Sequence, residues 1–202
     1  MNKVFAHALL ALVAVAPARA QQPIDPAVVE KYLQSTFGAA SPEWRARMKP
    51  DETLAVCSLT RNDPSPAEAE AIVARESARV RWPADGKLLG DWKAGYQIAN
   101  SGAGGQFSDP AGTPNGGNCY ACHQMDPKEV SYGTLGPSLT AYGKDRKYSQ
   151  QDVKNAYLKI YDSQAVSACS IMPRFGVNEV LSQQQIRDVL AYLFDPQSPV
   201  NQ

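Results

Sequence analysis

The sequence "GGNCYACHQM", residues 116–125, places two cysteines three positions apart, with a histidine directly after the second. Closely spaced cysteines of this kind serve structural zinc sites, thioredoxin-type redox pairs and covalent haem attachment. A zinc site usually draws four Cys or His ligands from two short-spaced pairs, but the other cysteines, Cys57 and Cys169, are isolated in the chain. A redox pair would follow a strand and open a helix, whereas the Gly- and Pro-rich segment 109–118 precedes this motif. The motif therefore favours haem.

Covalent haem attachment gives each residue of the motif a task. The thiols of Cys119 and Cys122 each add across a haem vinyl group, and the adjacent His123 is held against the iron as an axial ligand. The two thioethers fix one edge of the porphyrin, and the short turn between them delivers the imidazole to the metal. We therefore expect one covalently bound haem c.

Residues 1–20, "MNKVFAHALLALVAVAPARA", predict export. They contain a lysine, an apolar run and the small-x-small tripeptide Ala18-Arg19-Ala20 that signal peptidases recognise. The apolar run is well short of the ~20 residues that a bilayer requires, so a signal peptide is a better interpretation than a membrane anchor. Cleavage would make Gln21 the mature N-terminus, and we expect a soluble periplasmic protein.

The charge of the mature chain excludes two classes of partner. Without Lys3 and Arg19, 18 of the 20 basic residues remain against 20 acidic ones, which gives a net charge of −2. No basic stripe suited to nucleic acid is present, and no run of like charges would bind a membrane surface. We expect neither partner.

The sixth ligand of the iron follows from a shortage of histidine. His7 leaves with the signal peptide, so His123 is the only histidine of the mature chain, and a methionine thioether is the remaining soft ligand. Met125 lies too close to His123 in sequence to reach the opposite face of the ring, and Met48 lies in an N-terminal segment without haem chemistry. Met172, in a Pro- and Gly-containing loop, is the candidate. The alternative is that Met172 fills a gap in the core.

A Gly-Pro turn between the two candidate ligands supplies a hydrogen-bond acceptor. A neutral histidine ligand needs its second ring nitrogen held by such an acceptor, which fixes the tautomer. The backbone carbonyl of Pro137, in "SYGTLGPSLTAYGK", is the candidate. The alternative is an ordinary turn.

The fold class is predicted from helix start signals and apolar periodicity. Ser or Asp caps, some followed by Pro, open apolar patterns with helical spacing, and no run of alternating strand residues is present. Gly95 in one of these segments would let another helix approach, and the face from Leu190 to Leu193 is the expected partner. The fold is therefore all-α, with helices expected in residues 25–37, 65–82, 90–100, 149–161 and 182–194.

Cys57 and Cys169 remain after haem attachment. In an oxidising compartment such an even pair is expected to form a disulfide. The alternatives are two buried thiols, or a bond from one of them to a partner protein.

The chain resembles SoxX, the monohaem cytochrome c subunit of the SoxAX complex of bacterial sulfur oxidation. The resemblance lies in "GDWKAGYQIANSG", in "NGGNCYACHQMDPKEVSYGTLGPSLTAYGK" and in "IMPRFG", and it covers about Lys87 to Phe194. It implies a class I cytochrome c fold over residues 86–202, preceded by an N-terminal helical extension at 21–85. It also implies haem attachment at Cys119 and Cys122 and iron ligation by His123 and Met172.

The resemblance also implies partners. SoxX pairs with SoxA, whose haem is ligated by a reactive cysteine persulfide, and the complex oxidatively couples thiosulfate to a cysteine of the carrier SoxYZ. This chain would then accept the released electrons and pass them to a small cytochrome c, while the substrate chemistry stays on the SoxA-like subunit. No nucleophile with an adjacent base is visible in the chain, so no catalytic residue is assigned. The loops 101–112 and 171–176 are expected to form the docking surface.

Two alternatives stay open. A free-standing class I cytochrome c that shuttles electrons would need the same motifs and no SoxA-like subunit. A haem enzyme or gas sensor would need an open or labile sixth position, which exogenous cyanide or carbon monoxide would reveal.

Overall fold

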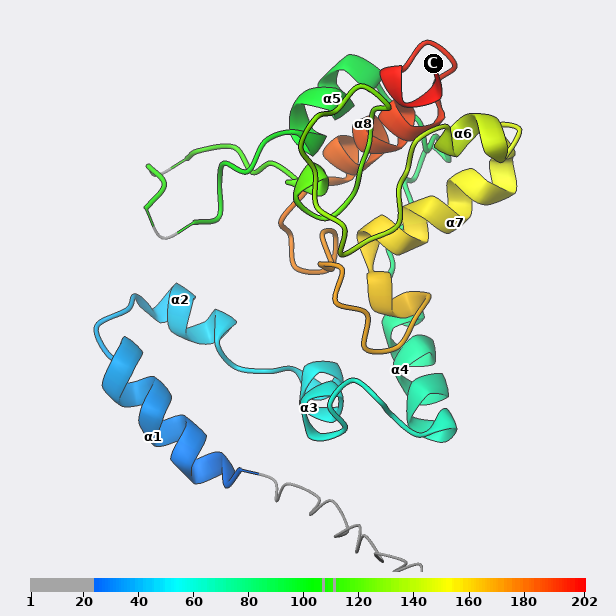
Figure 1. Cartoon of the computed structure of the whole chain (residues 1–202). Coiled ribbons are helices and arrows are strands. Elements are labelled where there is room, and N and C mark those ends of the chain that lie inside the picture. The colour runs from blue at the N-terminus through cyan, green and yellow to red at the C-terminus, as the bar shows by residue number, and fades with distance from the viewer. Residues whose placement is uncertain (1–23, 107, 111) are drawn as a thin grey trace, which may run out of the picture. The chain divides into compact units, whose positions relative to one another are not determined.

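The computed structural model describes residues 24–106, 108–110 and 112–202, and in these residues every regular element is a helix. The predicted signal peptide, 1–20, lies outside the described residues. The all-α prediction is thus confirmed for the described part of the chain (Figure 1). The α-helices are α1 Pro26–Phe37, α2 Pro42–Arg47, α3 Glu52–Leu59, α4 Pro66–Arg79, α5 Trp92–Ala99, α6 Tyr142–Asp145, α7 Gln150–Tyr161 and α8 Gln183–Phe194. Three short 3-10 helices are η1 Cys119–Ala121, η2 Ser163–Ala165 and η3 Pro199–Asn201.

The helices begin where the sequence signals them. The side chains of Ser65 and Ser182 each accept a hydrogen bond from the backbone amide of the residue three positions on, and the side chains of Glu68 and Gln185 in turn accept one from the backbone amide of the cap residue. These reciprocal bonds satisfy amide groups that a helix start leaves without partners. All five expected helices are present, and α2, α3 and α6 are additional.

The chain divides into two compact units, Met1–Lys49 and Pro50–Gln202. The first contains α1 and α2, which have no buried residues of their own. The second contains α3 to α8. The division therefore lies well before residue 85, where the sequence places the end of the extension, because α3 and α4 pack into the second unit.

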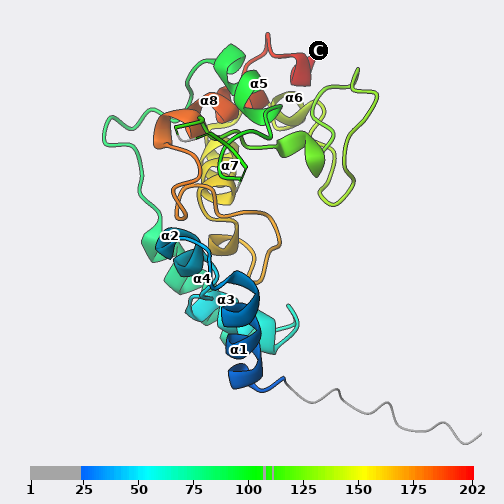
Figure 2. The same cartoon turned by 90° about the vertical axis from the view of Figure 1, so that its left-hand side faces the viewer.

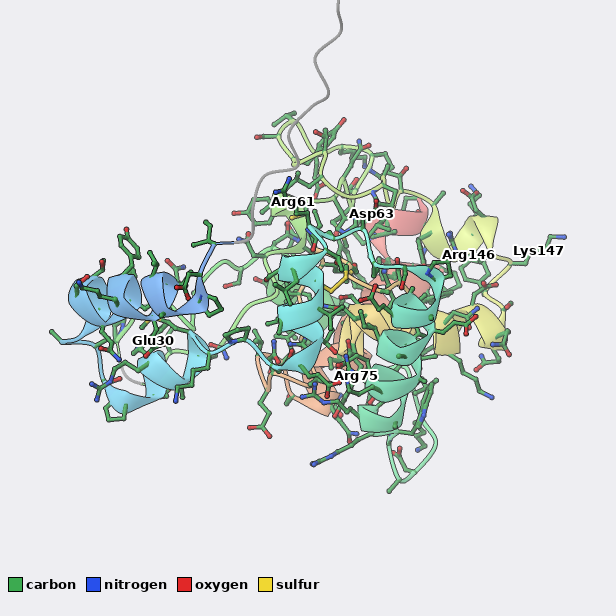
Figure 3. The ribbon with its side chains drawn as sticks, turned by 90° about the horizontal axis from the view of Figure 1, so that it is seen from below. Glu30, Arg61, Asp63, Arg75, Arg146 and Lys147 are labelled. Atoms are coloured by element: carbon green, nitrogen blue, oxygen red, sulfur yellow. A yellow bond between two sulfur atoms is a disulfide. The ribbon has the colours of Figure 1, made fainter. Side chains whose placement is uncertain are left out.

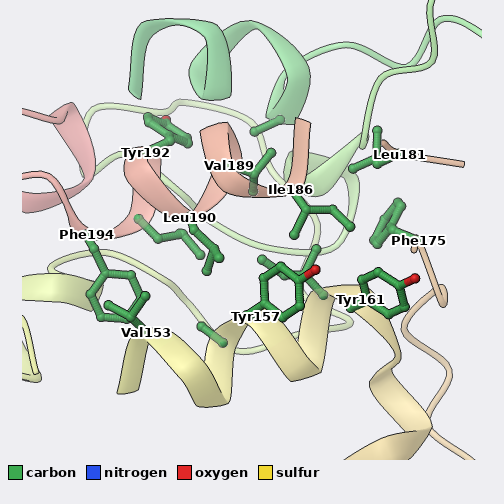
Figure 4. Close-up of a cluster of buried hydrophobic side chains, with 14 of the residues drawn as sticks. Val153, Tyr157, Tyr161, Phe175, Leu181, Ile186, Val189, Leu190, Tyr192 and Phe194 are labelled. Atoms are coloured by element: carbon green, nitrogen blue, oxygen red, sulfur yellow. The ribbon is translucent and has the colours of Figure 1, made fainter. Parts of the chain in front are cut away.

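The main core of the second unit lies around α8. This helix runs between α5 and α7, and buried aromatic and aliphatic side chains fill the space between α7 and α8 (Figure 4). A Cβ on Gly95 would collide with the backbone of Asp188 and with the Cβ of Tyr192. The glycine therefore allows α5 to lie directly on α8, as the sequence predicts for this pair of helices, and its closest neighbours on α8 are Asp188 and Tyr192.

A smaller core joins the α3–α4 segment to the loop after η2. Cys57 on α3, Ile72 on α4 and Cys169 are its buried members. Helices α3 and α4 lie beside each other in both views (Figure 1 and Figure 2), linked by the ion pair between Glu52 and Arg75 at 2.7 Å. The segment 50–80 therefore packs within the second unit.

Candidate haem site

The two motif cysteines lie on one tight turn. The backbone amides of Cys122 and His123 both donate to the carbonyl of Cys119, at 3.1 and 2.9 Å. Asn118 enters the turn in the left-handed region, with φ of 49°, where Asn is tolerated better than most residues. Both motif thiols are free. Burial raises the pKa of Cys119 to about 12, so this thiol stays protonated in its apolar surroundings.

The imidazole of His123 has a fixed orientation. Its Nδ1 lies 2.7 Å from the carbonyl oxygen of Pro137, so the Nδ1–H donates there and Nε2 is the atom left to bind a metal. The imidazole also lies directly beside Gly136, where an added Cβ would collide with Cε1. Gly136 donates its amide to the carbonyl of Cys122 at 2.8 Å, which holds the glycine beneath the ring. The structure thus brings Pro137 to the histidine, in the acceptor position that the sequence predicts.

The methionines occupy different environments. Met125 is 1% exposed and belongs to the main core, so it fills volume there. Met172 is partly buried and packs against that same core, as does Cys119. Met48 caps α2 in the first unit. Met172 is thus the methionine of the second unit that is only partly buried.

The loop that carries Met172 is tied down at three places. The backbone carbonyl of Met172 accepts a hydrogen bond from the Ser163 hydroxyl at 2.5 Å. Three residues earlier, Cys169 forms a disulfide with Cys57, with an S–S distance of 2.06 Å. Two residues later, Arg174 is buried and makes ion pairs with Asp51 and Glu76.

Two cavities border the second unit's loops. The larger, of about 720 Å³, is lined by residues such as Asn115, Tyr161 and Gln183 and by none of the predicted haem ligands. The smaller, of about 340 Å³, includes Met172 and the Cys57–Cys169 disulfide in its wall. The size of the cavities therefore does not identify the haem site. The site is identified by the chemistry of Cys119, Cys122 and His123.

The donor set fits a haem c. It offers two free thiols on one turn, an imidazole with Nε2 available and a glycine that leaves room for the ring. The contribution of Gly136 is absent from the sequence prediction. The position of Gly136 directly before Pro137 is the sequence signal that could have revealed this role. A side chain at residue 136 would compete for space with the imidazole ring of His123.

Comparison with known families decides the class. The cytochrome c family model matches residues 91–195. The chain belongs to the cytochrome c family. This cytochrome is accordingly an electron-transfer protein with covalently bound haem c, and its family domain begins at α5.

A relative shares most of the chain. An "Uncharacterized lipoprotein" from Aquifex aeolicus (strain VF5) is 32% identical over 184 residues, which cover 90% of this chain and 87% of the relative. The alignment is much longer than the family match, so the similarity includes sequence outside the cytochrome domain. No helix in the described part of the chain is long and apolar enough to cross a membrane.

Proposed function

We propose that this cytochrome is a SoxX-like electron-transfer subunit, with His123 and Met172 as the axial ligands of one haem c. The observation that carries the ligand assignment is the 2.7 Å contact between His123 Nδ1 and the Pro137 carbonyl, because it occupies Nδ1 and leaves Nε2 as the ring nitrogen that can bind the iron. When bound, the haem supplies a one-electron redox couple. Cys119 and Cys122 would hold it covalently, and His123 and Met172 would bind its iron.

His/Met ligation suits electron transfer better than ligand activation. It closes both axial positions and favours a positive reduction potential. With both positions filled, the iron has no site for a substrate, so this chain would accept electrons from a reaction carried out on a partner. The carbonyl of Pro137 raises the basicity of the imidazole through its hydrogen bond and stabilises the oxidised iron.

The partner assignment rests on the resemblance of residues 87–194 to SoxX. A SoxA-like haem subunit would form a heterodimer with this chain, couple thiosulfate to a cysteine of a SoxYZ-like carrier and release electrons. A small cytochrome c would receive them. Residues 101–112 and 171–176 are the proposed docking loops, and the side chain of Ile171, beside Met172, is 72% exposed.

The location is also a proposal. We propose export to the periplasm and cleavage after Ala20, on the basis of residues 18–20. The mass of the mature protein purified from its host tests this, because cleavage predicts an N-terminus at Gln21.

The ligand assignment is tested by the near-infrared methionine–sulfur charge-transfer band of the oxidised protein. The band should be present and should disappear in Met172→Ala, whose iron should bind carbon monoxide when reduced. Met125→Leu is the matched control, because it preserves core volume, and it should keep the band. A wild-type protein without the band, or one that binds carbon monoxide readily, would favour the sensor or enzyme alternative.

Coexpression with a SoxA-like subunit tests the partner. Size-exclusion chromatography at moderate salt should show a single heterodimer at micromolar concentration. Separate elution of the two proteins would favour a free-standing cytochrome c shuttle.

A further inference from the structure

Arg174 is a buried cation directly beside the proposed sixth ligand. It lies two residues after Met172 and is 4% exposed. Its Nη2 is 2.8 Å from Asp51 Oδ2 at the start of α3, and its Nη1 is 3.3 Å from Glu76 Oε2 on α4. A buried guanidinium needs charged partners, and both partners here come from helices that contain no haem ligand.

Glu76 is built to receive that cation. Its side chain is completely buried, and it accepts hydrogen bonds from the hydroxyl of Thr53 and from Arg79 Nη1. Arg75 adds a third cation, with Nε 3.6 Å from Glu76 Oε1. These donors and cations hold the pKa of Glu76 below its usual value despite its burial. The carboxylate is therefore ionised at neutral pH and pairs with Arg174.

Helices α3 and α4 also hold the chain on the N-terminal side of Met172. Cys57 of α3 is bonded to Cys169, three residues before Met172 (Figure 3 draws this disulfide in yellow beside α3). On α4, Ser77 donates to the carbonyl of Ala165 at 3.2 Å. Ala165 belongs to η2, whose Ser163 donates to the Met172 carbonyl. The disulfide, the Arg174 ion pairs and the Ser163 contact therefore link the loop to residues 50–80. The loop is also held by α7, because the backbone amides of Phe175 and Gly176 donate to carbonyls of that helix at 3.3 and 2.9 Å.

From this arrangement we propose that the α3–α4 segment, acting through Arg174, is a clamp that keeps the Met172 loop closed on the iron. Arg174 is a positioning residue: its ion pairs to Asp51 and Glu76 hold the backbone two residues beyond the sulfur ligand. This inference rests on the proposed role of Met172. It assigns a function to a segment outside the family domain, which begins at residue 91.

The physical reason for such a clamp is the weakness of the bond it protects. A thioether is a neutral, weak ligand, and loops are the mobile parts of a fold. If the loop opens, the iron becomes accessible to outside ligands even while the protein remains folded. Groups that orient a ligand commonly change metal-site properties by one to two orders of magnitude when removed.

Cyanide binding to the oxidised holoprotein measures that opening. In Arg174→Gln, the rate of cyanide binding should rise about tenfold or more over wild type, with a weaker methionine–sulfur band. Arg79→Gln is the matched control, because Arg79 pairs with the same Glu76 and Asp51, at 2.9 and 3.4 Å, but is not part of the ligand loop. Its cyanide rate should stay near that of wild type. Arg174→Lys should restore part of the wild-type behaviour.

A second variant covers the case in which Arg174→Gln does not fold. Glu76→Gln keeps the shape and the Thr53 hydrogen bond but removes the charge that Arg174 pairs with, so its cyanide rate should rise too. Equal rates in wild type and in whichever of these two variants folds would overturn the clamp while leaving Met172 as ligand. Equal increases in Arg79→Gln and Arg174→Gln would overturn it too, because they would reflect general destabilisation. If the wild-type protein lacks the methionine–sulfur charge-transfer band, the assignment of Met172 as an iron ligand is wrong, and the proposed clamp is wrong with it.

Discussion

At the scale of single residues, Gly136 is the most constrained position around the histidine. An alanine there would place its methyl group against Cε1 of His123, and the imidazole would have to move away from the Pro137 carbonyl. Overpacking of this kind costs about 1–3 kcal/mol. Gly136→Ala should therefore lower both the yield of haem-loaded protein and its thermal midpoint.

Gly102→Ala is the control for that substitution. Its added methyl group would meet Asn118 at 3.5 Å, an ordinary van der Waals distance, so haem loading should be unchanged. The haem content per chain of the two variants, measured from the absorbance of the reduced pyridine derivative, tests this prediction. Full loading of Gly136→Ala with an unshifted midpoint would show that the ring does not depend on this contact.

A second residue-scale prediction concerns the carboxyl pair Asp162 and Glu76. Burial and the adjacent Glu76 raise the pKa of Asp162 to about 6, and one carboxylate oxygen of Asp162 lacks a hydrogen-bond partner unless a proton is present. The folded protein thus holds a proton between about pH 4 and 6 that the unfolded chain releases. The free energy of unfolding should fall as pH rises through this window, by about 1–3 kcal/mol.

Asp162→Asn mimics the protonated form and should remove this slope. Glu76 has the opposite effect at lower pH: its lowered pKa means that stability is lost as pH falls below its ordinary value of 4.5. Urea unfolding of the holoprotein from about pH 3 to about pH 7 separates the two. A wild-type slope retained in Asp162→Asn would show that Asp162 is not the titrating group.

At the scale of elements, the crossing of α5 and α8 is the closest helix contact that a glycine permits here. Alanine at Gly95 gains up to about 1 kcal/mol of helix propensity. Its methyl group, however, would collide with the backbone of Asp188, which cannot move without shifting α8. The net effect should be a loss of about 1–2 kcal/mol, measured by denaturant unfolding. Gln97→Ala, at an exposed position of α5, should change stability by less than ~0.5 kcal/mol.

The elements themselves were largely predictable from the sequence because their signals are local. Caps such as Ser65 and Ser182 and apolar spacing of 3.6 residues lie within one segment. Helix α3 was missed because its eight residues carry no clear polar face. The Arg174–Glu76 pair joins residues 98 apart in sequence, and no local pattern specifies such a pairing. The haem motif, by contrast, was fully predictable from the sequence, because the residues that attach the haem lie within five consecutive positions.

At the scale of the whole molecule, the disulfide closes a loop of 112 residues. Such a closure removes conformational entropy from the unfolded chain and contributes about 2–5 kcal/mol. The double variant Cys57→Ser, Cys169→Ser should lose stability by about that amount in urea. Unfolding of the wild type with and without a thiol reductant gives an independent measurement. Equal stability of the two forms would mean that the rest of the fold already fixes the ends of this loop.

The two boundaries, at residue 49 and at residue 85, predict different outcomes of truncation. A mature chain that starts at Pro50 keeps α3, α4 and Cys57, so its haem unit should retain the spectrum and the stability of the full protein to within about 1 kcal/mol. A chain that starts at residue 86 keeps the whole family match but loses Asp51, Glu76 and Cys57. It should bind haem through the same motif and yet show rapid cyanide binding, because Arg174 and Cys169 lose the partners that hold the methionine loop. Absorbance spectra and cyanide kinetics of the two truncated holoproteins compare the boundaries directly, and slow cyanide binding in the shorter chain would place the functional boundary at residue 85.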